Sequence, residues 1–573
     1  MKHAVAKIED PIFDVIQRIT DAPAQGGMPS IAVIVDENNL VLGVVTDGDI
    51  RKAVCKRVDF NQPVSSIMSK DPVCVEEDLS TEEFIKSAYK KMEDRSSSTG
   101  RQINNKVIKI SKENKFIDIV NLHLLYRQED VSQRLIAVYG LGFVGLTLAL
   151  TLAENKLFEV VGIDVDKNKL EKLKDGVVPF YEVGLPSLLS QVLNEGNFNL
   201  SNDSQATQAD VHIVSVGTPI DDNGKPIVKF IDDVCNSIGK ILKKGDLVIC
   251  RSTVPVGTTR KHIIPILEKQ SNLKAGTDFH VSFAPERTVA GNALKELRVL
   301  PQVIGGYTPR CAKLCSSIFE KITKTIVNVD CLESAEVVKL INNTYRDLVF
   351  AFSNEVSYLC DRYNLDAFNV IQAANEGYPR NPIPTPSPGV GGTCLSKDPH
   401  LYGCHNNQNE FKEICLGNAS REINKKGVDY VCWQFNKFLK RMHLKAKDLP
   451  ILVMGLAFKG LPETSDYRNS PGVDLIQELK KMGCHVSVYD AVLKKSDMAE
   501  FGKVYDEASA ALKGHKAVFF MNNHPYNTKF ELYSGLKSLA APALVFDGFG
   551  LINKNEVQSI DGITYSTMGF MSQ

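Results

Sequence analysis

The chain has 573 residues, of which 43% are hydrophobic and 24% are charged, and its formal net charge at pH 7 is −1. This composition is typical of a soluble globular protein, and the length predicts about three or four domains. The nearly neutral charge, without a long basic run, argues against a protein that binds nucleic acid or a membrane surface.

The N-terminus does not resemble a signal peptide, and no apolar run is long enough to span a membrane. Residues 1–17 lack a continuous apolar core, and the longest apolar runs are strand-length or interrupted by glycine. The 13 cysteines are odd in number and scattered, and neither Cys311 and Cys315 nor the histidines form a metal-ligand pattern. We therefore expect a cytoplasmic protein with reduced thiols and no metal site.

The N-terminal part predicts a small α+β module built from two similar halves. A hairpin runs into a helix that begins near Thr46, Asp47 and Asp49, and a related pattern follows from Pro63 onward. The polar stretch 93–105 predicts a mobile loop, and 127–134 predicts a charged linker. The expected strands are 31–35, 40–45, 106–110 and 116–120, with a helix at 80–92, and the segments 63–68 and 71–75 begin the second half.

From Leu135 onward, strands alternate with helices, which predicts a parallel sheet. A long amphipathic helix is expected at 334–364, a proline-rich bend follows at 378–388, and helices resume to about Lys440. A second alternating unit then begins at Pro450. The expected strands are 135–139, 159–163, 211–216, 247–251, 279–283, 451–454, 485–489, 517–521 and 543–546, with a helix at 470–482.

The segment Leu135–Gly145 is predicted to be a strand that runs into a G-x-G-x-x-G turn and a helix. Gly140 allows the tight turn, Gly142 lets a pyrophosphate approach, and Gly145 lets helix and strand pack closely. Asp164 ends the next strand, where a carboxylate can accept both ribose hydroxyls and so select NAD over its 2′-phosphorylated form. Together these features predict NAD binding, whereas the motif alone would also fit a structural turn.

Two further turns follow strands of this sheet, at 216–219 and 252–258. Loops at the carboxyl ends of parallel strands face the ligand crevice. The hydroxyls of Thr218, Ser252 and Thr253 can therefore hold a nicotinamide ribose or a catalytic water. An ordinary turn rich in Ser, Thr and Pro is an equal alternative for each.

The segment Gly389–Pro399 places Cys394, Lys397 and Asp398 directly after a glycine run. If a helix starts here, its N–H groups point at the sulfur, and both a helix N-terminus and a nearby lysine lower the pKa of a cysteine. Because the thiolate is the nucleophile, Cys394 is a candidate for covalent catalysis, with Asp398 as a base or water holder. The alternative is a buried structural thiol, which is the common state of a cysteine.

A series of motifs in this order resembles the UDP-glucose/GDP-mannose dehydrogenase family, over about residues 134–560. The resemblance implies an α/β fold with two Rossmann-like parallel-sheet domains joined by a central long-helix region. It also implies that two NAD⁺ oxidise the C6 hydroxyl of a nucleotide sugar to a carboxylate. The motifs are 140–145, 217–219, 252–257, 284–287, 335–343, 389–398 and 455–460.

The resemblance assigns a chemical role to each motif. It implies that Cys394 captures the intermediate aldehyde as a thiohemiacetal, which is then oxidised to a thioester. Asp398 with Thr253 would position a water, Lys339 and Asn343 would stabilise the oxyanion, and Glu286 would assist hydrolysis. From spacing alone, Lys339 and Asn343 would rather form a solvated helix face.

Cofactor and substrate residues are also implied. Arg380 matches an arginine that reaches over from a neighbouring subunit, and the long central helix matches the dimerisation element, so a homodimer or higher assembly is expected. The implied NAD-binding residues are Gly140, Gly142, Phe143, Val144, Gly145, Asp164, Thr218, Pro219, Ser252, Thr253 and Lys397. The implied substrate-binding residues are Glu286, Arg287, Lys339, Asn343, Arg346, Arg380, Gly391, Gly392, Phe458, Lys459 and Arg468.

The sequence departs from the family pattern at Val183, Ala491 and Phe549, and the third departure lies near the expected nucleotide site. The stretch 342–355 resembles the branch that acts on UDP-N-acetylhexosamines, which favours UDP-N-acetylmannosamine or UDP-N-acetylglucosamine as the substrate of a surface-polysaccharide precursor pathway. UDP-glucose is the next alternative. A two-electron hydroxy-acid dehydrogenase would not need Cys394.

Residues 1–127 resemble a tandem CBS pair, the adenosine-nucleotide sensor module. The first repeat matches its G-h-x-T-x-x-D pattern through Thr46 and Asp49, whereas the second repeat, at 118–124, lacks both residues. At most one adenosine site is expected, and a pair that serves only assembly is an equal alternative. The implied domains are the CBS pair at 1–127, an NAD-binding domain at 134–330, a central helical domain at 331–440 and a nucleotide-sugar-binding domain at 441–573.

Overall fold

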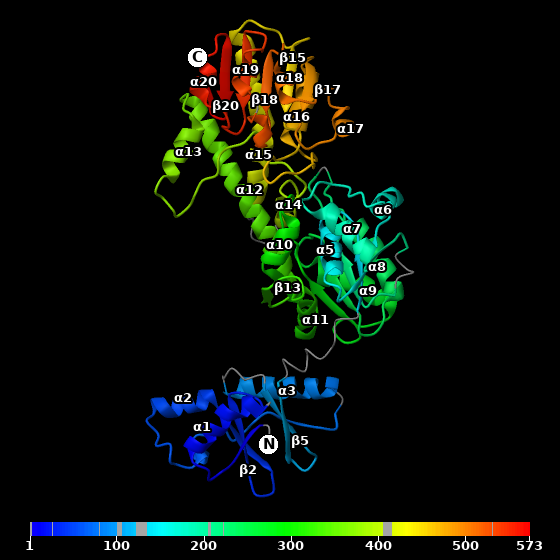
Figure 1. Ribbon diagram of the computed structural model, residues 1–573, viewed down its shortest axis with the longest axis vertical. Helices are drawn as coiled ribbons and strands as arrows, with labels where there is room; N and C mark the ends of the chain where they lie inside the picture. The colour runs from blue at the N-terminus through cyan, green and yellow to red at the C-terminus, as the bar shows by residue number, and fades with distance from the viewer. Residues whose placement is uncertain are drawn as a thin grey trace. The chain divides into compact units, whose positions relative to one another are not determined.

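Alternating hydrophobic strands and amphipathic helices organise the chain into two units, Met1–Asp130 and Val131–Gln573, in the computed structural model (Figure 1). The structure describes residues 3–25, 27–79, 81–99, 106–121, 134–203, 208–221, 223–404, 415–529 and 531–572. The expected linker at 127–134, apart from Arg134, lies outside these residues, as do positions 100–105 of the expected loop and positions 122–124 of the second repeat.

The first unit consists of two repeats with the same β-α-β-β arrangement. In each sheet the first two strands are parallel and the last two antiparallel, with a register shift near the end of the middle strand. The elements are β1 (Ala4–Lys7), α1 (Ile12–Asp21), β2 (Ile31–Val35), β3 (Val41–Thr46) and α2 (Asp47–Cys55), then β4 (Cys74–Glu76), α3 (Thr81–Thr99), β5 (Lys106–Ile110) and β6 (Phe116–Asn121).

The two hairpins of this unit join symmetrically. Asn39 and Asn114 occupy equivalent left-handed positions, with φ of 65° and 61°. The Phe116 N–H donates to the Asn39 carbonyl at 2.9 Å, and the Val41 N–H donates to the Asn114 carbonyl at 3.3 Å. The internal repeat is therefore a property of the fold.

The expectation of a loop at 93–105 is wrong for residues 93–99, because α3 continues to Thr99.

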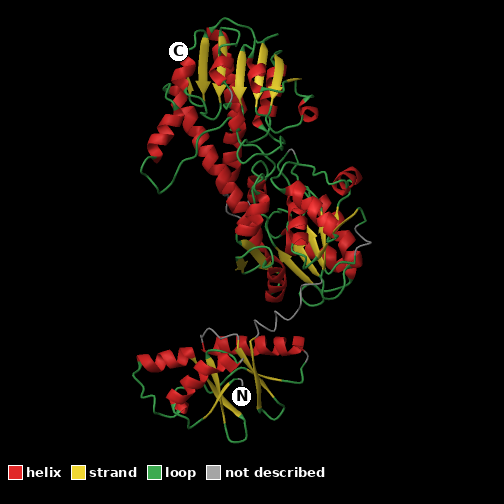
Figure 2. Ribbon diagram, viewed as in Figure 1, coloured by secondary structure: helices red, strands yellow, loops and turns green. Residues whose placement is uncertain are grey.

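An eight-stranded sheet, covered by helices on both faces, opens the second unit (Figure 2). All neighbouring strands are parallel except β12 and β13. In sheet order the strands are β14 (Ile326–Val329), β13 (Gln302–Gly306), β12 (His280–Phe283), β11 (Leu247–Cys250), β10 (Val211–Val214), β7 (Leu135–Tyr139), β8 (Glu159–Ile163) and β9 (Phe198–Ser201). The helices are α5 (Phe143–Glu154), α6 (Lys167–Lys174), α7 (Leu185–Glu195), α8 (Lys229–Ile241), α9 (Ile264–Ser271), α10 (Ala293–Val299) and α11 (Pro309–Phe319).

The predicted long helix is confirmed as α12 (Leu332–Arg362), which runs between the two sheet-containing parts of this unit (Figure 1). It packs along α15 (Leu416–Arg441), and α13 (Ala367–Asn375) and the short α14 (Asp398–Gly403) lie between them in sequence. Among the described residues, we find no helix with the length and apolar character needed to cross a membrane.

A seven-stranded sheet completes the second unit, parallel except for its last strand pair. The side chains of Phe435 and Phe438 on α15 pack into its core, which fixes this sheet to the central helices. In sheet order the strands are β17 (Lys503–Val504), β16 (His485–Tyr489), β15 (Pro450–Met454), β18 (Ala517–Phe520), β19 (Ala543–Asp547), β20 (Ile563–Thr567) and β21 (Phe570–Met571). The helices are α16 (Pro471–Lys481), α17 (Lys495–Met498), α18 (Ala508–Leu512), α19 (Leu532–Leu536) and α20 (Lys554–Gln558).

Candidate active site

Cys394 lies on the turn between the glycine run and α14, at the wall of a cleft between the two sheet-containing parts. The glycines before it are required by close packing. A Cβ on Gly391 would stand 2.4 Å from the Asn469 carbonyl, and one on Gly392, whose φ is 83°, would stand 2.9 Å from the Phe458 ring. The C-terminal part of the chain therefore supports the backbone that carries the thiol.

The expectation that a helix N-terminus points at the Cys394 sulfur is wrong, and although the nearby lysines do lower the pKa of the thiol, the net change is a rise. The helix begins only at Asp398, and the Asp398 N–H donates to the Cys394 carbonyl rather than to its sulfur. Although the residue is exposed to the cleft, the surrounding protein withdraws its thiol from bulk water and raises its pKa. The charges of Lys339 and Lys397 oppose this rise, and burial together with the carboxylates of Asp398 and Glu286 outweighs them.

Lys339 is buried and does not belong to a solvated helix face, because its ammonium lies 3.4 Å from Glu286 Oε2. Burial alone would lower the pKa of Lys339, but the charge of Glu286 and its other acidic neighbours raises it. Burial conversely raises the pKa of Glu286, and the charges of Lys339 and Arg251 lower it below its usual value. Both groups are therefore held charged beside the thiol.

Asn343, one turn along α12, donates to Asp398 Oδ2 at 2.6 Å, and both residues are buried. The other carboxylate oxygen, Oδ1, has no hydrogen-bond partner among the described residues, although the Lys397 ammonium lies 3.2 Å away. Lys397 in turn donates to Thr218 Oγ1 at 3.0 Å, and Thr218 donates to the Thr253 carbonyl at 2.6 Å. This chain of contacts connects the cysteine loop to the turns after β10 and β11.

The cleft has a volume of about 720 Å³ and opens onto the dinucleotide turn. It brings together residues from both sheet-containing parts and from the central helices. The predicted site residues that line it are Gly142, Phe143, Val144, Thr218, Pro219, Ser252, Thr253, Glu286, Lys339, Cys394, Lys397 and Arg468.

The G-x-G-x-x-G turn has the geometry that a dinucleotide needs. Gly140 has a φ of 91°, and a Cβ on Gly145 would stand 1.8 Å from the Gly140 carbonyl oxygen. By contrast, a Cβ on Gly142 would meet no atom within 4 Å, so the backbone at the start of α5 faces open space. A pyrophosphate can therefore approach the N–H groups of the first turn of α5.

Asp164 stands at the end of β8, where the sequence predicts it. Its carboxylate accepts from the Leu141 N–H at 2.8 Å and from the Lys169 ammonium at 2.8 Å. Burial raises the pKa of Asp164, and these donors outweigh burial and keep it below its usual value. Ser252, by contrast, donates its hydroxyl to the Val216 carbonyl at 2.7 Å and so supports the turn.

The residues expected to hold the nucleotide diphosphate differ in their surroundings. Lys459 donates to the Ala290 carbonyl at 2.7 Å, and burial lowers the pKa of this lysine to about 8. Arg468 is held by a two-point contact with Asp466, at 2.8 and 2.7 Å, and reaches the cleft.

The remaining expected substrate residues do not line the cleft described above. Arg287 donates to the Pro301 carbonyl, Arg346 is exposed on α12, and Arg380 is exposed and stacks on Tyr378 at 5.7 Å. Phe458 contacts the glycine loop from behind. These residues would need a different part of the substrate, or another subunit, as their partner.

Sequence reasoning missed Arg251 and Arg421, which are both buried and both line the cleft. Arg251 donates to the Ala284 carbonyl at 2.9 Å, and burial lowers its pKa to about 10 against the opposing charge of Glu286. Its position directly before the Ser252 turn was the only available signal. Arg421 lies within a helix and had no local signal.

Each of the three departures from the family pattern lies near an acidic residue whose carboxylate accepts hydrogen bonds from backbone N–H groups. Glu182, before Val183, accepts from the Gly291 and Ala293 N–H groups at 2.7 Å each. Asp490, before Ala491, accepts from the Leu456 and Ala457 N–H groups at 2.7 and 2.9 Å. Asp547 is buried and accepts from the Phe549 N–H at 3.2 Å and the Ile552 N–H at 2.8 Å.

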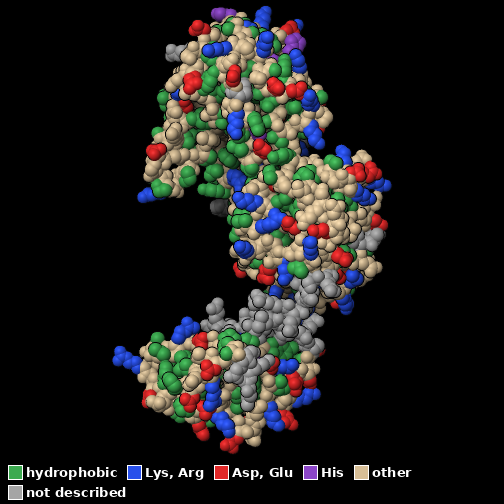
Figure 3. All heavy atoms as spheres, viewed as in Figure 1, with side chains coloured by type: hydrophobic (Ala, Val, Ile, Leu, Met, Phe, Trp, Pro, Cys, Tyr) green, Lys and Arg blue, Asp and Glu red, His purple; other side chains and the backbone are tan. Residues whose placement is uncertain are grey.

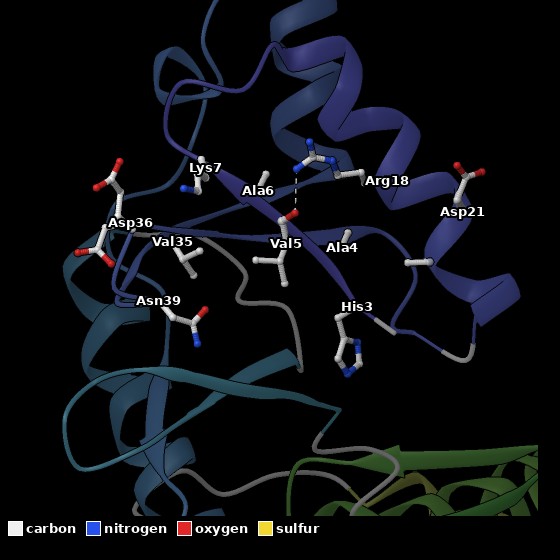
Figure 4. Close-up of a pocket in the computed structure, with 12 residues that line it drawn as sticks. His3, Ala4, Val5, Ala6, Lys7, Arg18, Asp21, Val35, Asp36 and Asn39 are labelled. Atoms are coloured by element: carbon white, nitrogen blue, oxygen red, sulfur yellow. Dashed lines mark hydrogen bonds between the residues drawn. The ribbon is translucent and has the colours of Figure 1, made fainter. Parts of the chain in front are cut away.

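In the first unit, Thr46 and Asp49 contact each other at the start of α2. The Thr46 N–H and hydroxyl both donate to Asp49 Oδ2, at 3.1 and 2.8 Å. A separate pocket of about 520 Å³ lies along β1, where Arg18 donates to the Val5 carbonyl at 3.0 Å (Figure 4). Neither Thr46 nor Asp49 lines this pocket.

Models of the UDP-glucose/GDP-mannose dehydrogenase family match the second unit along most of its length. The NAD-binding domain model matches residues 134–323, the central domain model matches 333–426, and the UDP-binding domain model matches 452–554. A CBS domain model matches residues 2–56 of the first unit.

Curated relatives and solved structures agree with these matches. The chain is 30% identical to a UDP-N-acetyl-D-mannosamine dehydrogenase of Pyrococcus horikoshii, over 74% of this chain and 97% of the relative. It is 34% identical to a UDP-N-acetyl-D-glucosamine 6-dehydrogenase of Pseudomonas aeruginosa, over 64% of this chain and 85% of the relative. The solved Pyrococcus horikoshii structure superposes with a TM-score of 0.68 and 30% identity, over 76% of this chain and 99% of that chain.

Proposed function

This chain belongs to the UDP-glucose/GDP-mannose dehydrogenase family, and we propose that it oxidises the C6 hydroxyl of a UDP-N-acetylhexosamine to the uronic acid. It is an NAD-dependent nucleotide-sugar dehydrogenase. The names of the similar relatives support UDP-N-acetylmannosamine or UDP-N-acetylglucosamine as the substrate. Such an acid would serve as a precursor of a surface polysaccharide.

The observation that carries the proposal is the position of the Cys394 thiol. It faces the cleft beside two buried polar pairs, Lys339 with Glu286 and Asn343 with Asp398. A two-electron dehydrogenase needs a base and a hydride acceptor but no nucleophile, whereas conversion of an alcohol to an acid passes through an aldehyde that must be retained. A thiol at this place supports the four-electron reaction.

The fit for NAD rests on the open backbone at Gly142 and on Asp164 at the end of the next strand. Gly142 to Val144 would hold the pyrophosphate, Asp164 the adenosine ribose, and Thr218 with Pro219 the nicotinamide end. Bound NAD⁺ supplies the hydride acceptor for both oxidations.

The chain's own residues account for the remaining chemistry. Asp398, through the oxygen that accepts no hydrogen bond, would hold the water that takes the proton of the C6 hydroxyl, with Thr253 alongside. The ammonium of Lys339 and the amide of Asn343 would then stabilise the negative charge on the C6 oxygen.

The covalent step needs the thiol to lose its proton. The Cys394 sulfur forms a bond to the aldehyde carbon, and the carbonyl electron pair moves to oxygen, which accepts a proton. Loss of a second hydride and a proton leaves the thioester, and water adds to it and releases the acid and the free thiol. Glu286 would orient this water, since Lys339 keeps its carboxylate charged.

A screen of UDP-sugars with NAD⁺, in which the release of NADH is measured, tests the proposal. We expect UDP-N-acetylmannosamine or UDP-N-acetylglucosamine to give two NADH per sugar, and Cys394→Ser to stop net formation of the acid. If UDP-glucose is the preferred substrate, only the assignment of the sugar changes and the proposed reaction stands. One NADH per sugar from the unmodified enzyme would favour a two-electron dehydrogenase, and two NADH from Cys394→Ser would remove the covalent step.

A homodimer or higher assembly is supported by an exposed apolar stripe on α12. Ile341, Tyr345, Phe352 and Leu359 are 44%, 68%, 51% and 54% exposed, and their spacing puts them on one helix face. Figure 3 shows hydrophobic side chains gathered on this central part of the second unit. We propose that a second copy covers the stripe, and that Arg380 then reaches the neighbouring site. Sedimentation of Tyr345→Glu as a monomer would support this.

For the first unit we propose an adenine-nucleotide effector near Thr46 and Asp49, on the strength of the CBS domain match. Asp49 already accepts two hydrogen bonds from Thr46, so a ribose would have to use the remaining carboxylate oxygen. Titration calorimetry with AMP and ATP tests the idea, and an absence of heat for both nucleotides would remove it.

A further inference from the structure

A buried polar network joins α12 to α15 directly behind the cysteine loop. Its centre is Asp347 on α12, which is fully buried, and Arg421 on α15, which is 3% exposed. Arg421 Nη1 lies 2.6 Å from Asp347 Oδ1. Ser420 Oγ and Asn424 Nδ2 donate to the same carboxylate at 2.7 and 2.8 Å. The carboxylate is thus well satisfied, and Arg421 is held in one orientation.

The network extends to the backbone of the loop. Both terminal nitrogens of Arg421 lie 3.4 Å from the carbonyl oxygen of Val390, four residues before Cys394. The loop also lies tightly on α15, since a Cβ on Gly427 would stand 2.3 Å from the Pro388 carbonyl oxygen. Val390 also lines the cleft, so this residue connects α15 to the cleft wall.

Arg421 also lines the cleft, and its buried Nε has no hydrogen-bond partner among the described residues. The positive charge of Arg421 also acts on a residue of α14. Burial lowers the pKa of His400, and the positive charges of Lys425 and Arg421 lower it further. The guanidinium thus contacts the loop before the thiol, and its charge also acts on the helix after it.

We propose that Arg421 is a positioning residue. It fixes the Val390 carbonyl to the Asp347 carboxylate and so sets where the Cys394 sulfur stands relative to the aldehyde carbon. The sulfur must approach that carbon for the C–S bond to form, while the first hydride transfer does not involve the sulfur. Loss of the contact therefore affects capture of the aldehyde more than its formation. The inference rests on the covalent function proposed above.

Arg421→Lys separates the two contacts of the guanidinium. A lysine can still pair with Asp347, but a single ammonium cannot reproduce the planar contact to both Asp347 and Val390. Since a displacement of about 1 Å can slow a reaction about 10²-fold, we expect capture to slow by about this factor. The NADH released per sugar should then fall from two toward one. Hydroxylamine in the assay should trap the released aldehyde as an oxime, which mass spectrometry detects.

Arg441→Lys is the matched control. Arg441 lies near the other end of α15 and donates to the Ser572 carbonyl and to Thr564 Oγ1, at 2.6 and 2.8 Å. It should keep two NADH per sugar and form no oxime. If Arg421→Lys does not fold, the double variant Arg421→Gln with Asp347→Asn removes both buried charges together and is expected to release aldehyde in the same way.

The possible outcomes distinguish a failure of the positioning role from a failure of the covalent function on which it rests. Two NADH per sugar and no oxime from a folded Arg421 variant would overturn the positioning role and leave the covalent mechanism intact. One NADH per sugar from the unmodified enzyme would overturn the covalent mechanism itself. Oxime from the Arg421 variant, with none from Arg441→Lys or the unmodified enzyme, supports the proposal.

Discussion

The amide of Asn343 donates to the carboxylate of Asp398 at 2.6 Å and so joins the long helix α12 to the short helix that follows the reactive cysteine. One carboxylate oxygen of Asp398 is used in this contact, and the other has no hydrogen-bond partner among the described residues. A buried oxygen that accepts no hydrogen bond is costly unless a nearby charge, a ligand or a water compensates it, and the Lys397 ammonium lies 3.2 Å from this one. The contact thus fixes the Asp398 carboxylate with its second oxygen beside the Lys397 ammonium, where a water would complete the hydrogen bonding of that oxygen.

We expect Asn343→Ala to lower kcat about 10²-fold, since a preorganised donor in the site is lost. Stability should fall by about 1–3 kcal/mol, because Asp398 Oδ2 would be left buried without its donor. Asn342→Ala is the matched control, as this neighbour is exposed. Initial rates and urea denaturation of both variants test this prediction. Equal rates for the two variants would contradict it.

The reactivity of Cys394 should depend on pH in a direction set by its neighbours. Burial and the nearby carboxylates raise the pKa of the thiol, and Lys339 opposes them. The fraction of thiolate therefore grows as the pH rises above the usual range of a cysteine. Lys339→Met should raise this pKa further and slow inactivation by iodoacetamide at pH 8, and Glu286→Gln should speed it. A faster Lys339→Met reaction would count against this electrostatic account.

Periodicity and motif order predicted the strands, the long helix and the cysteine loop, because these features depend on local sequence. They did not predict the partners of the loop. Lys339 and Asn343 looked like a solvated face, yet each is buried against a residue 53 or 55 positions away in the chain. The pairing of Arg421 with Asp347, separated by 74 residues, gave no local signal for the same reason.

The pKa of Lys459 provides a second pH test. Burial lowers the pKa of this lysine to about 8, so the ammonium is charged below that pH and loses its proton above it. If it binds the diphosphate, kcat/KM for the UDP-sugar should fall as the pH rises through about 8. Lys459→Arg should remove this inflection, because arginine stays charged. If the pH profile of kcat/KM is the same in the unmodified enzyme and in Lys459→Arg, Lys459 is not the group that causes the inflection.

Two glycines of the dinucleotide turn should separate cofactor binding from folding. An alanine Cβ at Gly142 meets open space, so we expect Gly142→Ala to keep the Tm and raise the KM for NAD⁺. The Cβ of Gly145→Ala would meet the Gly140 carbonyl at 1.8 Å, so this variant should lose several kcal/mol of stability. Calorimetry and cofactor titration distinguish the two effects. A Gly142→Ala protein with unchanged KM would show that the pyrophosphate does not approach there.

The first unit should modulate the reaction without being needed for it. Residues 131–573 form a compact unit, and the Pyrococcus horikoshii relative is matched over 97% of its own length by 74% of this chain. We therefore expect the chain truncated to 131–573 to keep its kcat, and to lose any response to AMP or ATP. The full chain carrying Thr46→Ala is the companion variant, since it removes the hydroxyl that donates to Asp49 at 2.8 Å. It should cost about 1 kcal/mol in the first unit and leave basal turnover unchanged. A truncated chain that folds but does not turn over would mean that the first unit takes part in catalysis.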